Sequence, residues 1–192
     1  MIKSGFKDYT QKLADVLAGY DWSPLEELTQ DFLTCWQEKR RIFLCGNGGS
    51  AGNAMHIAND FVYGVSQKLG EGLRISVLSS NVSVLTCLAN DEGYENIFSH
   101  PLSIDAEEGD VLIVLSGSGN SENILKAIQV AKQKGLKSYG ILGFDGGKAR
   151  EMVDVPLHFP VHDMQISEDI QLICMHMVMQ QLAALSKGEQ NA

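Results

Sequence analysis

The chain has 192 residues, of which 44% are hydrophobic and 20% are charged, so it is long enough to bury one substantial core. Its formal net charge of −9 argues against nucleic acid or an anionic membrane as the main partner, although a small anion needs only a local pocket. No apolar run reaches membrane-spanning length, and the N-terminus lacks the apolar core of a signal peptide. The four cysteines form no CxxC pair. We therefore expect a cytoplasmic protein whose cysteines are free thiols.

Two amphipathic helices are expected ahead of the first strand. Apolar residues recur at helical spacing over residues 3–19. Ser23 and Pro24 then supply an N-cap and a proline at the first position of a second helix, which ends near residue 40. This helical pair, residues 1–40, could pack on the sheet or equally well on another subunit.

After residue 40, short continuous apolar runs alternate with segments of helical periodicity. The runs indicate strands at residues 42–44, 74–78, 110–115, 138–142 and 155–159. Helices are expected at 81–89, 122–134 and 166–185, a turn at 90–93, and a short helix or extended connection at 97–101. In the last helix, we expect Ile170, Ile173, Met177 and Leu182 to face inward.

This alternation predicts an α/β fold with a doubly wound parallel sheet of five strands and helices on both faces. The chain, residues 1–192, is expected to be one domain, with the α/β sandwich over 41–186 and a frayed tail after it. Ligands of such sheets bind beyond the carboxyl ends of the strands.

The stretch 45–60 carries two features of a binding site. A glycine turn follows an apolar strand and opens a helix, where backbone N–H groups and the helix dipole favour an anion. Ser50 adds a hydroxyl at or near the N-cap of that helix. His56 and Asp60 fall one turn apart on one helix face. This combination indicates an active site for a phosphorylated substrate.

A second loop, residues 116–121, offers three serine hydroxyls between a buried strand and a helix N-terminus. It lacks the lysine of a P-loop, and its glycine spacing is not that of a dinucleotide-binding turn. A phosphate held by hydroxyls and backbone amides suits it better. The alternative is a solvated loop that only caps a helix.

Together these segments resemble the sugar isomerase (SIS) domain family and, within it, the bacterial phosphoheptose isomerases. The matching segments, in chain order, are 46–50, 54–56, 89–91, 116–121 and 145–148. The resemblance implies a flavodoxin-like sheet, a homotetramer with active sites between subunits, and a small sugar phosphate as substrate. It implies isomerisation of sedoheptulose 7-phosphate to D-glycero-D-manno-heptose 7-phosphate, for the synthesis of heptose and lipopolysaccharide.

The resemblance also assigns roles by position. The residues expected to bind the sugar are Asn47, Gly48, Gly49, Ser50, Asn90, Asp91 and Glu168. Those expected to hold the phosphate are Ser116, Gly117, Ser118 and Ser121. Asp60 and His176 are the expected catalytic residues, with Asp60 as the base. The expected zinc ligands are His56, Asp60, Glu168 and His176.

The chain departs from the family pattern at several of these positions. Asp60 stands where the family has glutamate, and Glu168 stands where it has glutamine. Gly64 and Val65 stand where an arginine is expected, and Gly117 replaces a threonine. Because these departures cluster at the site, a different sugar phosphate stays open as the substrate.

The residues themselves suit this chemistry. Aldose–ketose isomerisation moves a proton between adjacent carbons through an enediol, which requires a base and a proton donor. Two histidines and two carboxylates are ligands that zinc accepts. Glu168 and His176 lie about 12 Å apart along a regular helix. Either the helix start is irregular, or the two belong to different composite sites.

Other interpretations stay open at this stage. His56 and His176 could be ordinary helix or interface histidines, and Glu168 could be a helix N-terminal carboxylate. The protein could also be a non-catalytic SIS protein that binds a phosphosugar, or a scaffold that associates with the replication initiator. The presence of His56, His176 and a carboxylate at position 60 favours the enzyme.

Overall fold

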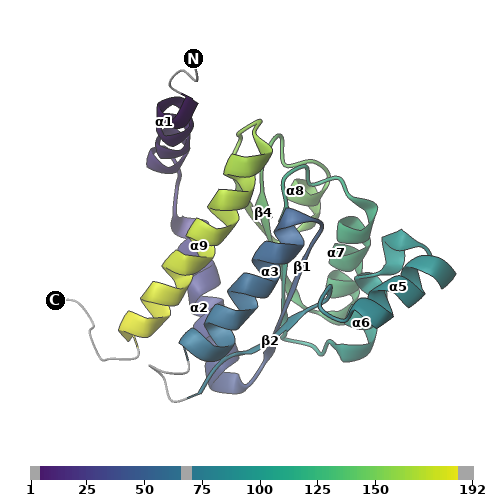
Figure 1. Ribbon diagram of the computed structural model, residues 1–192. Coiled ribbons are helices and arrows are strands. Elements are labelled where there is room, and N and C mark those ends of the chain that lie inside the picture. The colour runs from purple at the N-terminus through teal and green to yellow at the C-terminus, as the bar shows by residue number, and fades with distance from the viewer. Residues whose placement is uncertain (1–4, 66–70, 186–192) are drawn as a thin grey trace.

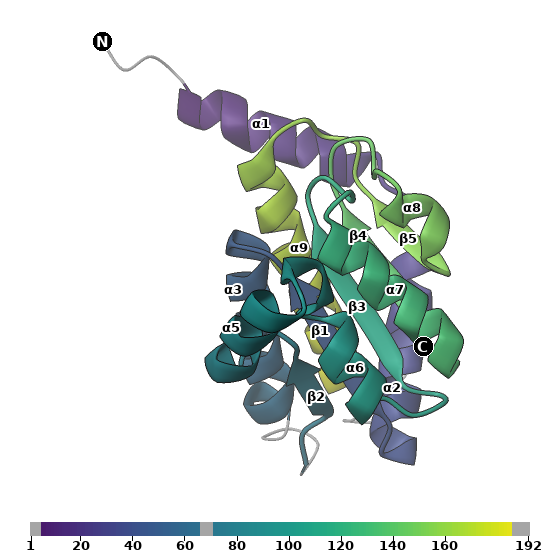
Figure 2. The same cartoon turned by 90° about the vertical axis from the view of Figure 1, so that its right-hand side faces the viewer.

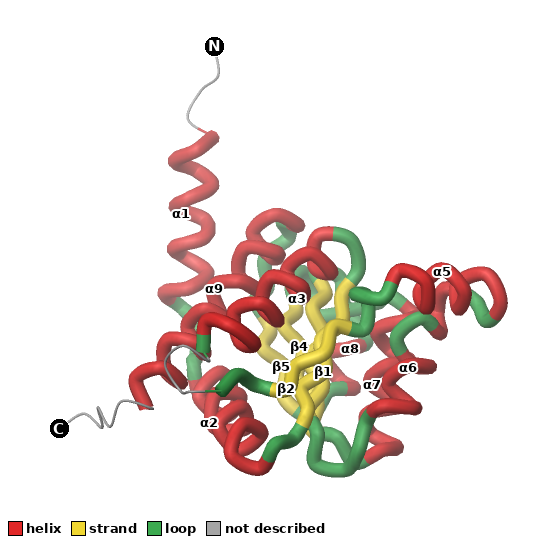
Figure 3. The backbone as a smooth tube through the Cα atoms, turned by 60° about the horizontal axis from the view of Figure 1, so that its bottom comes forward, coloured by secondary structure: helices red, strands yellow, loops and turns green. Residues whose placement is uncertain are grey.

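A computed structural model describes residues 5–65 and 71–185, and within them a five-stranded sheet in the order β2-β1-β3-β4-β5. All neighbouring strands are parallel. Figure 3 shows the sheet between two sets of helices. The strands are β1 (Arg41–Gly46), β2 (Arg74–Val77), β3 (Val111–Ser116), β4 (Lys137–Leu142) and β5 (Val155–His158). The predicted doubly wound parallel sheet is therefore confirmed.

Each face of the sheet has its own buried core, because successive side chains of a strand point to opposite faces. In β1, Ile42 and Leu44 enter one core, and Phe43 and Cys45 enter the other. The first core lies under α2 (Ser23–Glu38), α3 (Gly49–Asn59) and α9 (Met164–Leu185) (Figure 1). The second lies under α5 (Val82–Asp91), α6 (Ser99–Asp105), α7 (Glu122–Lys134) and α8 (Ala149–Met152) (Figure 2). Burial on both faces explains the continuous apolar runs of the strands.

The buried stripe of α9 differs from the predicted one. Ile166, Ile170, Cys174, Val178 and Leu182 are buried and follow one another at a spacing of four residues. The prediction for Ile170 and Leu182 is thus confirmed. It is wrong for Met177, which is 37% exposed because it lies one position, about 100° of helix rotation, away from the stripe. Ile173 is only partly buried.

Two local predictions also need correction. The turn expected at 90–93 is shorter, since α5 continues through Asp91 and Gly93 makes the turn with a φ of +92°. The short helix predicted as one possibility at 97–101 is present, since α6 begins at Ser99 after a 3₁₀ turn over Tyr94–Asn96. The second helix begins at Ser23 with Trp22 as N-cap, and the Ser23 hydroxyl donates to Asp21 instead of capping the helix.

Helix α1 (Gly5–Ala18) contains no buried residue and projects from the body of the molecule (Figures 1 and 3). Tyr9 donates a hydrogen bond to Asp169, and Lys12 pairs with Asp163 at 3.0 Å, so α1 is attached near the start of α9. Phe6 is 82% exposed. The predicted first two residues of this helix, 3 and 4, and the predicted frayed tail lie outside the described residues.

The cysteines are free, as expected, and Cys35, Cys45 and Cys174 are buried while Cys87 is exposed. Burial raises the pKa of Cys35 and of Cys174 to about 12, so these thiols stay protonated at neutral pH. None of the helices in the described part of the chain combines the length and the apolar character that crossing a bilayer requires.

Candidate functional site

A pocket of about 260 Å³ lies where the strand order of the sheet reverses, between β1 and β3. The chain leaves β1 for α3 on one face and leaves β3 for α7 on the other, so the two loops part there and leave a crevice. The lining residues are Asn47, Gly48, Gly49, Ser50, Leu115, Ser116, Gly117, Ser118, Ser121, Met164 and Glu168. The structure thus brings both predicted loops together.

The first loop needs glycine for its geometry. Gly48 is the N-cap of α3 and has a φ of +55°, which side-chain-bearing residues rarely adopt. A Cβ on Gly46 would lie 2.8 Å from the Cβ of Ser50. Ser50 itself is in the first turn of α3, not at the N-cap, and its buried hydroxyl accepts a hydrogen bond from Gln171 at 3.0 Å.

Asn47 is held by two residues that the sequence analysis did not identify. Its side-chain amide exchanges two hydrogen bonds, each 2.9 Å, with the side-chain amide of Asn123. Tyr94 donates a third hydrogen bond, at 3.0 Å, to the Oδ1 of Asn47. Asn123 is 2% exposed, so this network fixes Asn47 from below the pocket.

The serine loop is more rigid than its composition suggests. The Oγ of Ser116 accepts from the N–H of Gly119 at 3.0 Å, and Ala149 donates to the carbonyl oxygen of Gly119 at 2.9 Å. A Cβ on Gly119 would lie 1.9 Å from the carbonyl oxygen of Gly146, so the loop packs closely on its neighbour. Ser121 is the N-cap of α7 and makes no side-chain capping bond. The pocket therefore offers a hydroxyl and a helix N-terminus to an anion.

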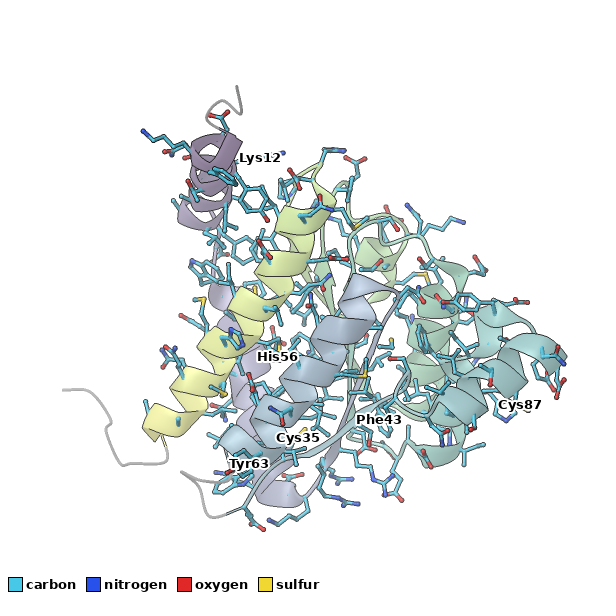
Figure 4. All side chains as sticks on the ribbon, viewed as in Figure 1. Lys12, Cys35, Phe43, His56, Tyr63 and Cys87 are labelled. Atoms are coloured by element: carbon cyan, nitrogen blue, oxygen red, sulfur yellow. The ribbon has the colours of Figure 1, made fainter. Side chains whose placement is uncertain are left out.

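Three titratable side chains meet farther along α3. The Oδ2 of Asp60 lies 3.4 Å from the Nε2 of His56 and 3.2 Å from the Nε2 of His176. The two histidine nitrogens are 3.1 Å apart. His56 and Asp60 come from α3 and its end, and His176 comes from α9, which runs beside α3 (Figure 4). The predicted histidine–carboxylate cluster thus exists within one chain.

The end of α3 at Asp60 is irregular. A π-helical turn covers Asp60–Gly64, and the N–H of Val65 donates to the carbonyl oxygen of Asp60 at 2.9 Å. Such turns are rare and occur often at functional sites. The two nitrogens and one oxygen of this cluster all lie within 4.8 Å of one another, so they could hold a metal ion.

A buried polar contact fixes α9 beside α3. The amide of Gln171, which is fully buried, donates to Ser50, and its oxygen accepts from Asn53 at 3.0 Å. Asn53 also donates to the backbone oxygen of Glu168 at 2.9 Å. Because His56 follows on α3 and His176 on α9, these bonds set the position of one histidine relative to the other.

With this geometry in view, comparison with known proteins identifies the family. Residues 6–143 match the family model described as the SIS domain. The chain belongs to the SIS domain family. A phosphoheptose isomerase from Aliarcobacter butzleri is 36% identical over 157 residues, which are 82% of either chain. One from Nitratiruptor is 38% identical over 142 residues, 74% of this chain and 75% of that protein.

Solved structures give the same result for this SIS domain. A phosphoheptose isomerase from Neisseria gonorrhoeae superposes with a TM-score of 0.80, at 28% identity and 91% coverage of both chains. One from Francisella tularensis, at 22% identity, has a TM-score of 0.87 and shows the shared fold. The predicted resemblance to the phosphoheptose isomerase family is therefore confirmed.

In this SIS domain, Glu168 lies apart from the histidine cluster. Glu168 does not belong to the group of His56, Asp60 and His176. Its carboxylate instead lies against Gly49, where a Cβ would come within 2.3 Å of the Glu168 Oε1. It faces the N-terminus of α3, where the helix dipole favours a negative charge. Within one chain, Glu168 is thus a pocket residue, and its role as a metal ligand stays a prediction.

Asn90 and Asp91 are exposed at the end of α5 and are not among the described residues that line the pocket. Asp91 accepts hydrogen bonds from Asn90 at 2.7 Å and from the Cys87 thiol at 3.4 Å. That thiol has a pKa raised by its hydrogen bond to Asp91 and by the charge of the carboxylate. The contact of Asn90 and Asp91 with substrate stays a prediction, which requires a site formed between subunits.

At position 117, where the family has threonine, neighbouring side chains fill the space beside Gly117. A Cβ on Gly117 would lie 2.7 Å from the sulfur of Met164 and 3.4 Å from the Phe144 ring. Met164 therefore occupies the space that a side chain at position 117 would need. Gly64 is not crowded in this way, since the nearest atom to its Cβ position is the Met179 sulfur at 3.7 Å.

Proposed function

We propose that this protein is an aldose–ketose isomerase that converts sedoheptulose 7-phosphate into D-glycero-D-manno-heptose 7-phosphate. The names of its relatives support the substrate. One observation carries the reaction type: Asp60 lies beside two imidazoles, at the end of a helix that begins at an anion pocket. His56 comes seven positions after Gly49, about 10 Å along α3, a length comparable to that of an extended heptose phosphate.

In this proposal, the serine loop and the N-terminus of α7 bind the phosphate. Asp60 removes a proton from carbon 1 of the ketose while the oxygen on carbon 2 gains a proton, which gives the enediol. The proton then returns to carbon 2 as the hydroxyl on carbon 1 loses its own, which gives the aldose. The Oδ2 of Asp60 faces the imidazoles. Its Oδ1, which has a contact of 3.4 Å with Asn59, is left to carry the proton.

His176 serves the substrate oxygens in this scheme. Its Nε2 lies 3.2 Å from the Asp60 carboxylate, so acid and base stand side by side. While its Nε2 is not bound to a metal, a histidine can donate a proton to one oxygen and accept one from the other at neutral pH. With a metal ion on that nitrogen, the ion would take over the contact with the oxygens.

We also propose that His56, Asp60 and His176 bind a zinc ion. Zinc bonds of about 2.0–2.1 Å in a tetrahedral site separate ligand atoms by about 3.3 Å. The three distances here are 3.1, 3.2 and 3.4 Å, which fits such a site. A bound zinc ion would polarise the substrate carbonyl. Glu168, the fourth ligand implied by the resemblance, would have to leave the pocket or come from another chain.

A homotetramer in the cytoplasm, with sites between subunits, completes the proposal. The exposed Phe6 on the projecting α1 and the position of Asn90 and Asp91 outside the pocket support an assembled site. The product would supply heptose for surface polysaccharide such as lipopolysaccharide.

Turnover of sedoheptulose 7-phosphate by the purified protein, with and without added zinc, tests this function. Asp60→Asn is expected to lower kcat by about 10²–10⁴-fold, the usual contribution of general acid–base catalysis. Asp105→Asn, an exposed aspartate at the end of α6, is the matched control and keeps full activity.

Absence of turnover under both conditions would contradict the proposal. Turnover of another sugar phosphate alone would keep the isomerase and replace the substrate. A cellular phenotype that survives Asp60→Asn would instead favour the non-catalytic alternative.

A further inference from the structure

The amide pair between Asn47 and Asn123 determines which hydrogen-bonding group Asn47 can offer to a ligand. Asn47 lines the pocket, whereas Asn123 is buried below it in the first turn of α7. Each side chain donates to and accepts from the other at 2.9 Å. The two amides therefore fix one another's orientation.

A backbone group sets the direction of the pair. The N–H of Ile124 donates to the Oδ1 of Asn123 at 2.9 Å. A backbone N–H can only donate, so this end of Asn123 has to be the oxygen and its other end the NH₂ group. The NH₂ of Asn123 then has to meet the oxygen of Asn47. The donor and acceptor ends of Asn47 thus follow from a backbone contact on α7.

Counting the groups of Asn47 shows what is left. Its Oδ1 has two lone pairs, and both are used, because Asn123 and Tyr94 each donate to it. One of its two N–H groups donates to Asn123. No other residue in the described part of the chain accepts from this amide, so a single N–H of Asn47 is available.

We propose that Asn123 is a positioning residue that holds Asn47 as a single N–H donor to an oxygen of the bound sugar. The identity of the ligand rests on the proposed function. The group that Asn47 recognises is an acceptor, a carbonyl or hydroxyl oxygen, and the contact strengthens as negative charge develops on that oxygen on the way to the enediol. Phosphate binding at the serine loop does not depend on this pair.

Asn123→Leu tests the proposal, since leucine keeps the branching of the side chain and brings no charge to the N-terminus of α7, but can no longer donate to Asn47 or accept from it. The N–H of Ile124 keeps its hydrogen bond to the carbonyl oxygen of Ser121, at 3.0 Å. We expect the affinity for sedoheptulose 7-phosphate to fall about tenfold, the effect of one lost hydrogen bond. Calorimetry should show an unchanged affinity for inorganic phosphate. In a double-mutant cycle, Asn123→Leu should add nothing to Asn47→Ala.

Tyr94→Phe is the second variant, because Tyr94 is 54% exposed and its ring can remain in place. It removes one donor to Asn47, and we expect a twofold to fivefold loss of sugar-phosphate affinity, a loss smaller than that of a whole hydrogen bond. Tyr94→Phe serves as the test if Asn123→Leu does not fold.

Three results would overturn the proposal: sugar-phosphate affinity unchanged in both variants, equal loss for inorganic phosphate, or additive losses in the cycle. Binding of sedoheptulose 7-phosphate by the wild type without turnover would contradict the proposed reaction only. Absence of any binding would overturn both.

Discussion

At the scale of single residues, hydrogen bonds within the chain hold several polar groups of the pocket in place. The hydroxyl of Ser50 is bound by Gln171, and that of Ser116 by the N–H of Gly119. Asn47 retains one N–H, while the side chain of Ser121 makes no capping bond. A pocket whose polar groups are fixed in this way binds its ligand with little loss of side-chain freedom.

Glu168 gives a prediction at this scale. Its carboxylate lies at the N-terminus of α3 in the same pocket as the serine loop. Two like charges about 4 Å apart repel by about 1 kcal/mol in a water-like medium. We therefore expect Glu168→Gln to raise the affinity for inorganic phosphate about fivefold, measured by calorimetry.

Glu151→Gln, an exposed glutamate on α8, is the control for Glu168→Gln and should leave the affinity unchanged. Weaker phosphate binding in Glu168→Gln would show that the carboxylate assists the anion, for example through a metal ion. That result would assign Glu168 to the metal ligands as well as to the pocket lining.

The sequence predicted the residues of the two loops but not the residues that support them. The glycine turn and the serine loop have local patterns, so Gly48 and Ser121 could be identified without a structure. Asn123 lies 76 positions from Asn47, and Gln171 lies 121 positions from Ser50. No local pattern marks a buried amide whose partner comes from a distant segment, and only the fold brings the two together.

At the scale of elements, α3 and α9 carry the histidine cluster and Gln171 joins them. Gln171→Met keeps the volume of the side chain but leaves Ser50 and Asn53 without their partner. We expect the free energy of unfolding to fall by about 1–3 kcal/mol, the cost of unsatisfied buried polar groups. Urea denaturation measures it.

Gln180→Met, at an exposed position of the same helix, is the control and should change stability by less than about 0.5 kcal/mol. An unchanged stability in Gln171→Met would contradict a structural role for the contact. A loss of activity in Gln171→Met, measured where the variant is fully folded, would support an effect of Gln171 on the position of His176.

The strands and long helices could be predicted because burial on two faces or on one stripe leaves a clear pattern. Helix α7 was predicted with its observed bounds. The error at Met177 arose because α9 is apolar on several faces, so its pattern does not identify the side that faces the sheet. The end of α5 was misplaced because Asn90 and Asp91 suit a turn as well as a last helical turn.

At the scale of the whole molecule, α1 stands apart from the rest. Its residues are at most partly buried, and Tyr9, Leu13, Val16 and Leu17 are the ones that pack against the core. We expect a chain without residues 1–18 to fold cooperatively but to lose the proposed tetramer. Sedimentation and thermal unfolding, performed on the same samples, distinguish the two effects.

Lys12→Ala is the control for that truncation. It removes only the ion pair with Asp163, and an exposed pair contributes about 0–1 kcal/mol, so the assembly should persist. A truncated chain that still forms tetramers would show that α1 does not hold the subunits together.

The amide pair at the pocket also bears on how the protein ages. Asn47 precedes Gly48, and asparagine followed by glycine is the sequence in which the backbone nitrogen most readily attacks the side-chain amide and expels ammonia. That reaction needs the side chain to turn until its carbonyl carbon reaches the backbone nitrogen of Gly48, whereas hydrogen bonds with Asn123 and Tyr94 hold the Asn47 amide in one orientation. The contact that orients Asn47 for a ligand therefore also slows its conversion to aspartate, and the working lifetime of the pocket depends on a residue that the ligand does not touch.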